Sequence, residues 1–309
     1  NYRPWMALCV GVLGFAVAAW GALAPGNLAA LFAEEAALRL GRPVHVAGGA
    51  TLELSPRLAI RLGDVTIAGA PGSETPFLKA SALRLRVTPF ALLAHRLEQF
   101  EIGLAGASLN LTIDEINQAS WPAAVKLGTG PVRFVFDGAD LNFEDRRNDQ
   151  SFSLAGANLA VTVAADDSLT AEGTLPVNGR LVSVNGFVRD FTRVAGMGSP
   201  ANLEVKTAGL TASFDGRLTT AGALGLAGQI VIAGDDFRRT LGWIGASPVG
   251  TSGLAAFSIA GTLDSSGRAL AIRDAELMLD GIKGRGHLTA DYRGEAPKFA
   301  AAIATGAVT

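Results

Sequence analysis

The sequence has little of what polar chemistry and covalent cross-linking need. It contains one cysteine, Cys9, and three histidines, and only 17% of its 309 residues are charged. Because one cysteine cannot form a disulfide within the chain, packing and hydrogen bonds must hold the fold together. The net charge of −2 and the lack of any lysine or arginine run argue against a nucleic-acid partner, since phosphate backbones are bound by basic patches.

Sequence motifs for catalysis and metal binding are also missing. The three histidines, His45, His95 and His287, are far apart and lack a second ligand at metal-site spacing. There is no G-x-S-x-G nucleophile motif, and Gly284-Arg285-Gly286 is predicted to be a hairpin turn rather than a phosphate loop. Four adjacent acidic pairs are predicted to be solvated: Glu34-Glu35, Glu144-Asp145, Asp166-Asp167 and Asp235-Asp236. We therefore expect no enzymatic activity, no metal and no cofactor.

What the sequence does contain begins with a long uncharged run. Residues Trp5 to Ala24 carry no charged side chain, and as a helix they are just long enough to cross the hydrocarbon core of a bilayer, about 30 Å. We interpret residues 1–26 as a transmembrane anchor, with Trp5 and Trp20 at the membrane interface and Arg3 favouring a cytoplasmic N-terminus. The alternative is a signal peptide, whose apolar region is usually only about 7–15 residues long.

A short amphipathic helix is predicted directly after the anchor. Apolar residues recur at helical spacing from Asn27 to Leu40, with Asn27 as N-cap and with Gly41 and Pro43 as the stop signal. This helix could pack on the end of a sheet or lie on the lipid surface, and the sequence leaves both open. A second short helix is predicted at residues 89–97, where Pro89 occupies the first turn.

From Val44 onward the apolar residues recur at every second position, which is the spacing of β-strands. A dozen or more such runs are separated by clusters of Gly, Asp, Asn and Ser at hairpin spacing. We therefore predict a mostly β protein with a long, twisted antiparallel sheet that has one apolar face. That face must be covered, closed or left as an open groove, so a closed β-sandwich is the alternative.

One short pattern, apolar-x-Gly-Ala-x-Leu-x-apolar, occurs three times, starting at Leu104, Phe136 and Leu154. Each copy is predicted to be a turn that feeds a strand. The intervals between the copies are unequal, so the pattern is not the fixed repeat of a propeller or solenoid.

The order of the pieces in the first 125 residues carries a family resemblance. The predicted membrane helix comes first, followed by the amphipathic helix, which closes in Gly41-Arg42-Pro43-Val44. After them come Leu54-Ser55-Pro56-Arg57, then Leu62-Gly63-Asp64-Val65, then Pro76-Phe77-Leu78. Ser120-Trp121 stands where the family commonly has Asn-Trp. In this order the chain resembles the AsmA-like proteins of Gram-negative bacteria. Residues 27–125 form the N-terminal AsmA-like region, and residues 126–309 continue it as a β-rich groove region.

The resemblance implies a single-pass protein of the bacterial inner membrane with its body in the periplasm, similar to bridge-like lipid-transfer proteins. The predicted function is to carry phospholipid acyl chains in an apolar β-groove between the inner and outer membranes. The alternative is a membrane-tethered scaffold for outer-membrane protein or envelope assembly, with protein partners there. The residues predicted by periodicity to line the groove are Leu83, Leu85, Val87, Leu109, Leu111, Phe134, Phe136, Leu141 and Phe143.

The length of the predicted groove is limited by the number of strands. About thirteen strands at roughly 4.8 Å each give about 60 Å, which is short for a bridge between two membranes. The chain also stops at Thr309 directly after a strand-like segment, without a terminal helix. We therefore expect a fragment of a longer protein, an end-to-end assembly, or a carrier that passes lipid onward.

Overall fold

The computed structural model describes residues 25–53, 59–86, 100–116, 118–120, 130–147, 149–220, 223–245, 255–291 and 298–305. Trp5, Trp20 and the rest of the predicted anchor up to Ala24 lie outside these residues, as do His95, the predicted helix at 89–97 and Val87. In the part of the chain that the structure describes, no helix is both long and apolar enough to span a membrane.

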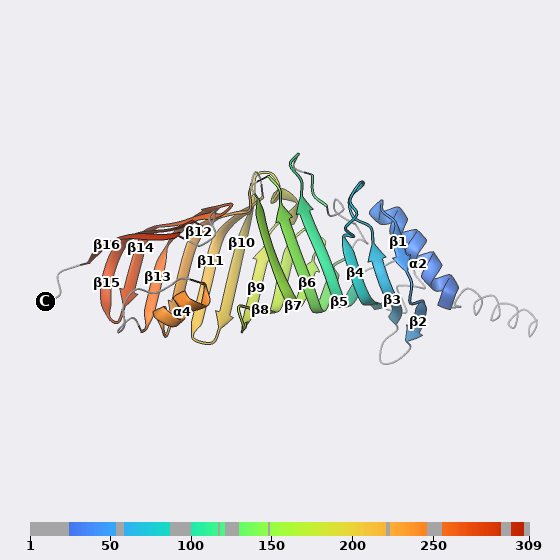
Figure 1. Cartoon of the computed structure of the whole chain (residues 1–309), viewed down its shortest axis with the longest axis horizontal. Helices are drawn as coiled ribbons and strands as arrows, with labels where there is room; N and C mark the ends of the chain where they lie inside the picture. Colours follow the sequence, from blue (N-terminus) through green and yellow to red (C-terminus); the bar gives the residue numbers. More distant parts are fainter. Residues whose placement is uncertain are drawn as a thin grey trace, which may run out of the picture.

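One large open sheet makes up most of the molecule (Figure 1). Its strands follow the sequence order, β1-β3-β4 and onward to β16, and β2 also pairs with β3. The mostly β prediction is confirmed, and the described strands form a single unclosed sheet rather than the alternative closed sandwich. The strands are β1 (Val44–Val46), β2 (Ala50–Glu53), β3 (Ala59–Ile67), β4 (Leu78–Arg86), β5 (Phe100–Ile113), β6 (Val132–Asp145), β7 (Gln150–Val163), β8 (Leu169–Val177), β9 (Arg180–Val188), β10 (Ser199–Thr207), β11 (Leu210–Thr219), β12 (Gly225–Gly234), β13 (Phe257–Ser266), β14 (Ala269–Leu279), β15 (Ile282–Asp291) and β16 (Lys298–Thr305).

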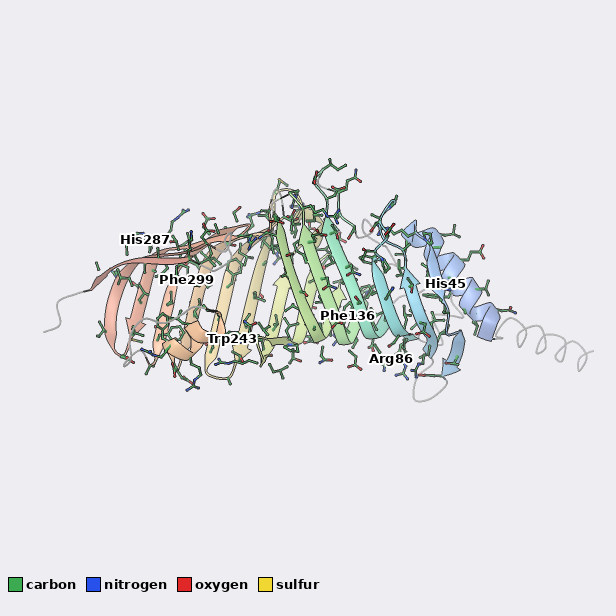
Figure 2. The ribbon with its side chains drawn as sticks, in the orientation of Figure 1. His45, Arg86, Phe136, Trp243, His287 and Phe299 are labelled. Carbon is green, nitrogen blue, oxygen red and sulfur yellow. The ribbon has the colours of Figure 1, made fainter. Side chains whose placement is uncertain are left out.

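The sheet is long in the direction across its strands. His45 in β1 and Phe299 in β16 lie near its two ends (Figure 2). Gly284-Arg285-Gly286 lies inside β15, so the prediction of a hairpin turn at that point is wrong. The turn between β14 and β15 lies instead at Asp280 and Gly281, which both have positive φ.

One pair of neighbouring strands departs from the predicted antiparallel arrangement. β5 and β6 are parallel, with Phe100 opposite Val132 and Ile113 opposite Asp145. Parallel neighbours need a crossover connection, because the chain must return to the starting end of the sheet. The described start of this connection is closed by Asp114, whose Oδ1 accepts hydrogen bonds from the backbone N–H of Ile116 (3.1 Å) and Gln118 (2.7 Å).

The repeated Gly-Ala pattern lies inside strands, so its prediction as a turn is wrong. Gly106, Gly138 and Gly156 have φ of 52°, 62° and 70°, and they stand in the middle of β5, β6 and β7. A left-handed residue within a strand produces a β-bulge, which shifts the following side chains to the other face. Asp64 in β3 and Asp274 in β14 do the same, with φ of 48° and 50°.

The bulges explain why one face of the sheet stays apolar along each long strand. Leu104 and Leu109 are an odd number of residues apart, yet both pair with apolar residues of β6, namely Phe136 and Leu141. The residue directly after each bulge is almost fully buried, with exposed fractions of 0% to 1% at Val65, Ala107, Ala139, Ala157 and Ala275. Small residues fit there because the strand bends sharply toward its neighbours.

The predicted amphipathic helix is present as α2 (Pro25–Leu40), and it packs on the end of the sheet beside β1 (Figure 1). Its buried side presents Ala29, with Leu28 and Phe32, to the core cluster that contains Leu62 and Val65. This confirms the first of the two interpretations of the helix.

A second helix, α4 (Phe237–Trp243), follows β12 and was not predicted. The Asp236 carboxylate caps it by accepting a 2.8 Å hydrogen bond from the backbone N–H of Arg239. In the predicted solvated pair Asp235-Asp236, Asp236 is therefore a helix cap. Most of the buried apolar side chains form two clusters, one across β2 to β6 with α2 and one across β11, β13 and β14, where Phe214, Ile259 and Ile272 lie.

Candidate functional site

Apolar residues line up in two rows across the face of the sheet on which both core clusters lie, with glycine at three of the row positions. The pairing registers connect each member to the next in the neighbouring strand, and no polar side chain interrupts either row. The first row is Leu62, Leu83, Leu104, Phe136, Leu159, Gly173, Val184, Val205, Ala212, Ile232, Ile259 and Leu277. The second is Ile60, Leu85, Ile102, Phe134, Val161, Ala171, Gly186, Leu203, Phe214, Ile230 and Gly261. We call this side of the sheet the apolar face.

Much of the apolar face is only half-buried. In β10, Leu203 and Val205 are half-buried and the alternating Glu204 is exposed, and the same holds for Ile230 and Ile232 in β12. A second layer packed on these strands would bury such side chains fully. A contiguous, partly exposed apolar surface of this extent marks an interaction site.

The structure places all the predicted lining residues on the apolar face, apart from Val87, which lies outside the described residues. Leu83 and Leu85 stand in the two rows, as do Phe136 and Phe134. Two further pairs extend the face toward the end of β6: Leu109 opposite Leu141, and Leu111 opposite Phe143. Leu83 is 5% exposed and belongs to the core cluster. The lining role of the others stays a prediction.

Sequence reasoning missed the part of the apolar face that β8 and β9 contribute. Glycine takes apolar-face positions there, Gly173 opposite Leu159 and Gly186 opposite Leu203, so the alternation of large apolar residues fades. The signal that remained was Val182 and Val184, two positions apart in β9, of which Val182 is 3% exposed.

The opposite face carries cross-strand ion pairs as well as exposed apolar side chains such as Val231 and Met278. Arg84 pairs with Glu53, Arg86 with Glu101, and Arg285 with Glu276 at 2.7 Å. A hollow of about 440 Å³ on this face lies among Asn185, Asn202, Glu204, Ser213, Asp215 and Gln229, with no histidine in its lining.

Histidines and carboxylates do not converge in the described ranges. His45 and His287 lie toward opposite ends of the sheet (Figure 2). In those ranges no three His, Cys, Asp or Glu side chains gather as a metal ion would require.

The sheet forks between β7 and β8. β7 pairs with β6 along its whole length, but with β8 only from Asn158 to Val163. The rest of these two strands, Ala139–Asp145 of β6 and Gln150–Ala157 of β7, extends past β8 and stays in the sheet through the pairing of β6 with β5, and we call these two strand segments the arm. Pro176 occupies β8 beside Gly156, where β7 diverges. Because proline has no N–H, no backbone donor of that residue is left unpaired at the fork.

Side chains hold the two bulges of the arm in place. The backbone N–H of Gly138 donates a 3.0 Å hydrogen bond to Asn158 Oδ1, and the N–H of Gly156 donates one of 3.0 Å to Asp140 Oδ1. Each bulge is thus fixed by a residue from the opposite strand of the hairpin. The arm therefore has a built-in bend.

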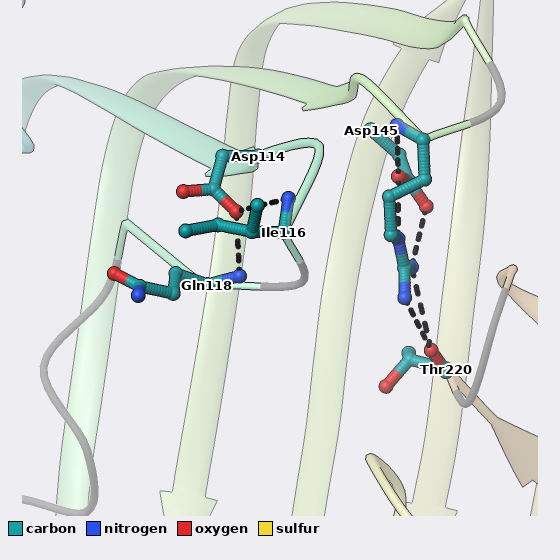
Figure 3. Close-up of polar contacts among 6 residues, drawn as sticks. Asp114, Ile116, Gln118, Asp145 and Thr220 are labelled. Atoms are coloured by element: carbon teal, nitrogen blue, oxygen red, sulfur yellow. Dashed lines mark hydrogen bonds and ion pairs between the residues drawn. The ribbon is translucent and has the colours of Figure 1, made fainter.

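The tip of the arm touches the far margin of the sheet. Along the pairing ladders, the tip residues Arg147 and Asp149 belong to one margin and Thr220 to the other, four strands away from β7. Yet both Nη atoms of Arg147 donate hydrogen bonds to the Thr220 carbonyl oxygen, at 3.3 and 3.4 Å (Figure 3). Arg268 likewise donates a 3.3 Å bond to the Asp149 carbonyl oxygen. The arm thus spans a stretch of sheet that is about 19 Å wide at roughly 4.8 Å per strand.

Arg147 is held by Asp145, the last residue of β6. Its Nε donates to Oδ1 at 2.9 Å and its Nη2 to Oδ2 at 2.7 Å, and the Asp145 side chain is fully buried. The hydrogen bonds from Arg147 lower the pKa of the Asp145 carboxyl below its ordinary value, and the carboxylate raises the pKa of Arg147. The prediction that Glu144-Asp145 is a solvated pair is therefore wrong for Asp145. Asp145 shares the apolar face with Phe143 and Leu141, so the tip meets the far margin on that side.

At the other margin of the sheet, α4 forms hydrogen bonds with the β8–β9 turn. Trp243 Nε1 donates a 3.0 Å hydrogen bond to the Val177 carbonyl oxygen, and Asn178 Nδ2 donates one of 2.9 Å to the Trp243 carbonyl oxygen. The Arg180 guanidinium lies over the Trp243 ring, 5.4 Å from its centroid. These contacts join the end of β12 to the β8–β9 turn, so the central strands are held at both margins.

Comparison with known proteins gives one finding for the N-terminal part of the chain. The model of the AsmA family matches residues 6–131, which include α2 and strands β1 to β5. A comparison with curated proteins finds no match.

Proposed function

We propose, from the premise that the match over residues 6–131 supports an AsmA-like assignment of this chain, that the protein binds phospholipid acyl chains on its apolar face. AsmA family membership indicates an envelope-associated protein. The finer proposal is that the anchor fixes the body to the inner membrane, that the body lies in the periplasm, and that lipid moves along the face toward the outer membrane.

The observation that carries the proposal is the pair of apolar rows. Acyl chains have no hydrogen-bond donors or acceptors, so a surface that binds them needs apolar area and no polar partner. Each square ångström of apolar surface that leaves water contributes about 25 cal/mol. Because each row continues from strand to strand without a polar side chain, an acyl chain can slide along it without losing a specific contact.

The rows run across the strands, so the path is as long as the sheet. Fifteen strands in sequence along the sheet have fourteen spacings, which at roughly 4.8 Å give about 67 Å. This slightly exceeds the 60 Å expected from the sequence, because the path contains fifteen strands rather than about thirteen. No catalytic group is needed for such a path, which agrees with the proposal that the protein is not an enzyme.

The test compares charges on the two faces of the neighbouring strands β10 to β12. Val205→Asp together with Ile232→Asp places two carboxylates in the first row, whereas Ser213→Asp together with Val231→Asp places two on the polar face. Bound phospholipid is measured by native and lipid mass spectrometry, and folding by circular dichroism. We expect the first pair to abolish copurifying lipid and the second to retain it. Equal lipid content in both folded variants would contradict the proposal.

An envelope-assembly scaffold is the second candidate, and β16 favours it. Phe299 and Ile303 of this edge strand are 44% and 47% exposed, and an exposed strand edge can accept a strand from a partner protein. This candidate predicts a lipid-free protein that captures a defined envelope protein through β16. Replacing Ala301 in β16 by proline removes a backbone donor from the free edge, because the neighbouring Ala302 backbone faces β15, and should then abolish the capture.

A further inference from the structure

Arg180 is a cation on the apolar face, at the margin where β9 begins. It shares that face with Val182 and Val184, because alternate residues of a strand point to one side and β9 pairs with β8 without a bulge. Among the apolar-face positions of β8 to β13, all of which lie in the described ranges, it holds the only charge. Resting on the proposed function, we propose that Arg180 binds the headgroup phosphate of a phospholipid whose acyl chains lie on the apolar face.

A tight hairpin turn fixes the backbone of Arg180. Asn178 and Gly179 have φ of 46° and 75°, as a two-residue turn of type I′ requires, and Val177 pairs with Arg180 across it. The same turn is joined to α4, because Asn178 Nδ2 donates a 2.9 Å hydrogen bond to the Trp243 carbonyl oxygen. Both β8 and α4 therefore set the position of Arg180.

Trp243, at the margin of the sheet, orients the guanidinium of Arg180 (Figure 2). The guanidinium lies over the indole ring, 5.4 Å from the ring centroid, and the indole is itself fixed by its 3.0 Å hydrogen bond to the Val177 carbonyl oxygen. The negative face of the ring attracts the cation. An aromatic ring offers no oxygen lone pair, so this contact leaves the guanidinium without an oxygen acceptor for its N–H groups. Trp243 is thus a positioning residue.

The guanidinium of Arg180 has no carboxylate partner. Within the described part of the chain it forms no ion pair or hydrogen bond, whereas Arg84, Arg86 and Arg285 on the opposite face each meet a carboxylate. Residues 246–254, which follow α4 in the sequence, include no Asp or Glu. The fork of N–H donors matches the paired oxygens of a phosphate, and such charge-assisted hydrogen bonds are the strong ones.

The charges next to the site also favour an anion. α4 adds Arg238 and Arg239 to this margin, and Asp235 and Asp236 directly precede the helix. Together with Arg180, this makes three cations against two carboxylates. The Asp236 carboxylate is already engaged, because it caps α4 and pairs with Arg239 at 3.3 Å.

A headgroup at this margin stays in water while its acyl chains reach the rows. Val182 and Val184 follow Arg180 along β9 at about 7 Å and 13 Å, and Val184 belongs to the first row. A phosphate held by Arg180 therefore places the first methylene groups near Val182 and the rest of the chain on the apolar rows. The apolar stem of Arg180 suits this boundary, because arginine packs its methylene groups on apolar surface and keeps its charge at the polar edge.

Two lipids with identical acyl chains test the site, because phosphatidylglycerol carries a phosphate and diacylglycerol does not. Each lipid carries the same fluorescent acyl chain, and its dissociation constant for the full chain is measured by titration. Arg180→Met removes the charge and keeps an apolar stem. We expect it to weaken the binding of phosphatidylglycerol by about tenfold and to leave the binding of diacylglycerol unchanged.

Two further variants make the comparison decisive. Arg285→Met removes the same charge from the opposite face, where Arg285 pairs with Glu276, and both dissociation constants should stay as they are in the native chain. Arg180→Lys keeps the charge without the planar fork, so it should weaken phosphatidylglycerol binding by less than Arg180→Met does. Circular dichroism checks folding, and if Arg180→Met does not fold, the selective loss must be seen in Arg180→Lys.

A water-soluble phosphate ester distinguishes a lipid headgroup from a free phosphate. sn-Glycerol 3-phosphate has the phosphate but no acyl chain, so at the same concentration as the lipid it should not displace labelled phosphatidylglycerol. Displacement would show that the site takes free phosphate esters and would overturn the assignment to a lipid headgroup.

The remaining outcomes separate this site from the proposed function. Equal affinity for phosphatidylglycerol in the native and Arg180→Met chains overturns the headgroup site and leaves acyl-chain binding standing. A native chain that binds neither lipid overturns both. A loss confined to phosphatidylglycerol in Arg180→Met, with Arg285→Met unchanged, supports both.

Discussion

Asp145 and Glu144 are adjacent carboxylates in opposite environments, and this contrast makes them informative at the scale of single residues. Asp145 is fully buried against Arg147, whereas Glu144 is about half exposed. We predict that Asp145→Asn lowers the free energy of unfolding by about 2–4 kcal/mol, because it leaves a nearly buried guanidinium without its charge partner. Glu144→Gln should cost less than about 0.5 kcal/mol. Urea denaturation of both variants measures this, and equal losses would refute it.

The same pair predicts how stability depends on pH. The pKa of Asp145 is lower in the folded state than in the unfolded chain, because Arg147 donates hydrogen bonds to the carboxylate. Its contribution to stability is therefore complete above the unfolded pKa of about 3.9 and is lost as pH falls through the folded pKa. The stability difference between the native chain and Asp145→Asn should be constant from neutral pH to about pH 5 and shrink below about pH 4. Denaturation midpoints across this range test the sign.

At the scale of elements, the bulges decide where strands bend, and glycine is required at the ones in the arm. Gly156 has φ of 70°, a conformation that costs most other residues about 1–2 kcal/mol. We predict that Gly156→Val destabilises the protein by about that amount. Gly242→Ala in α4 is the control, since nothing lies within 4 Å of the added methyl, and it should be neutral or slightly stabilising. Thermal unfolding compares the two, and an equal loss in Gly242→Ala would contradict the role of the bulge.

At the scale of the whole molecule, the two buried clusters are separated by strands that hold few large buried side chains. Protection from exchange depends on buried contacts, so we predict slow amide exchange in β3–β6 and β11–β14 and faster exchange in β8 and β9. Hydrogen–deuterium exchange with mass spectrometry measures this profile. A single uniform exchange rate across all strands would show that the sheet unfolds as one unit instead.

What the sequence predicts well is periodic and local. The amphipathic helix was predicted at residues 27–40 and is found at Pro25–Leu40, because its apolar spacing and stop signal both lie in adjacent residues. The apolar face followed from alternation in strands such as Leu203 to Val205. Most candidate lining residues therefore fell on that face.

What the sequence could not predict depends on tertiary geometry. Gly106 in a bulge and a glycine in a turn give the same local signal, so only the pairing partners distinguish them. Arg147 and Thr220 are 73 residues apart, and nothing in either neighbourhood indicates that they meet. The parallel pairing of β5 with β6 likewise depends on a crossover that the alternation of residues does not encode.

The strand order has a consequence for how such a sheet can change in length. Each strand after β3 is hydrogen-bonded only to the strands before and after it in the chain, so a hairpin inserted between two of them disturbs no distant contact. One hairpin adds two strands, keeps every later strand running in its original direction, and lengthens the sheet by about 10 Å. The region from β7 to β14 is the exception, because residues next to the ends of β6 and β7 contact Thr220 after β11 and Arg268 between β13 and β14. The number of strands in the sheet can therefore change by whole hairpins outside this region, whereas within it the number of strands is fixed.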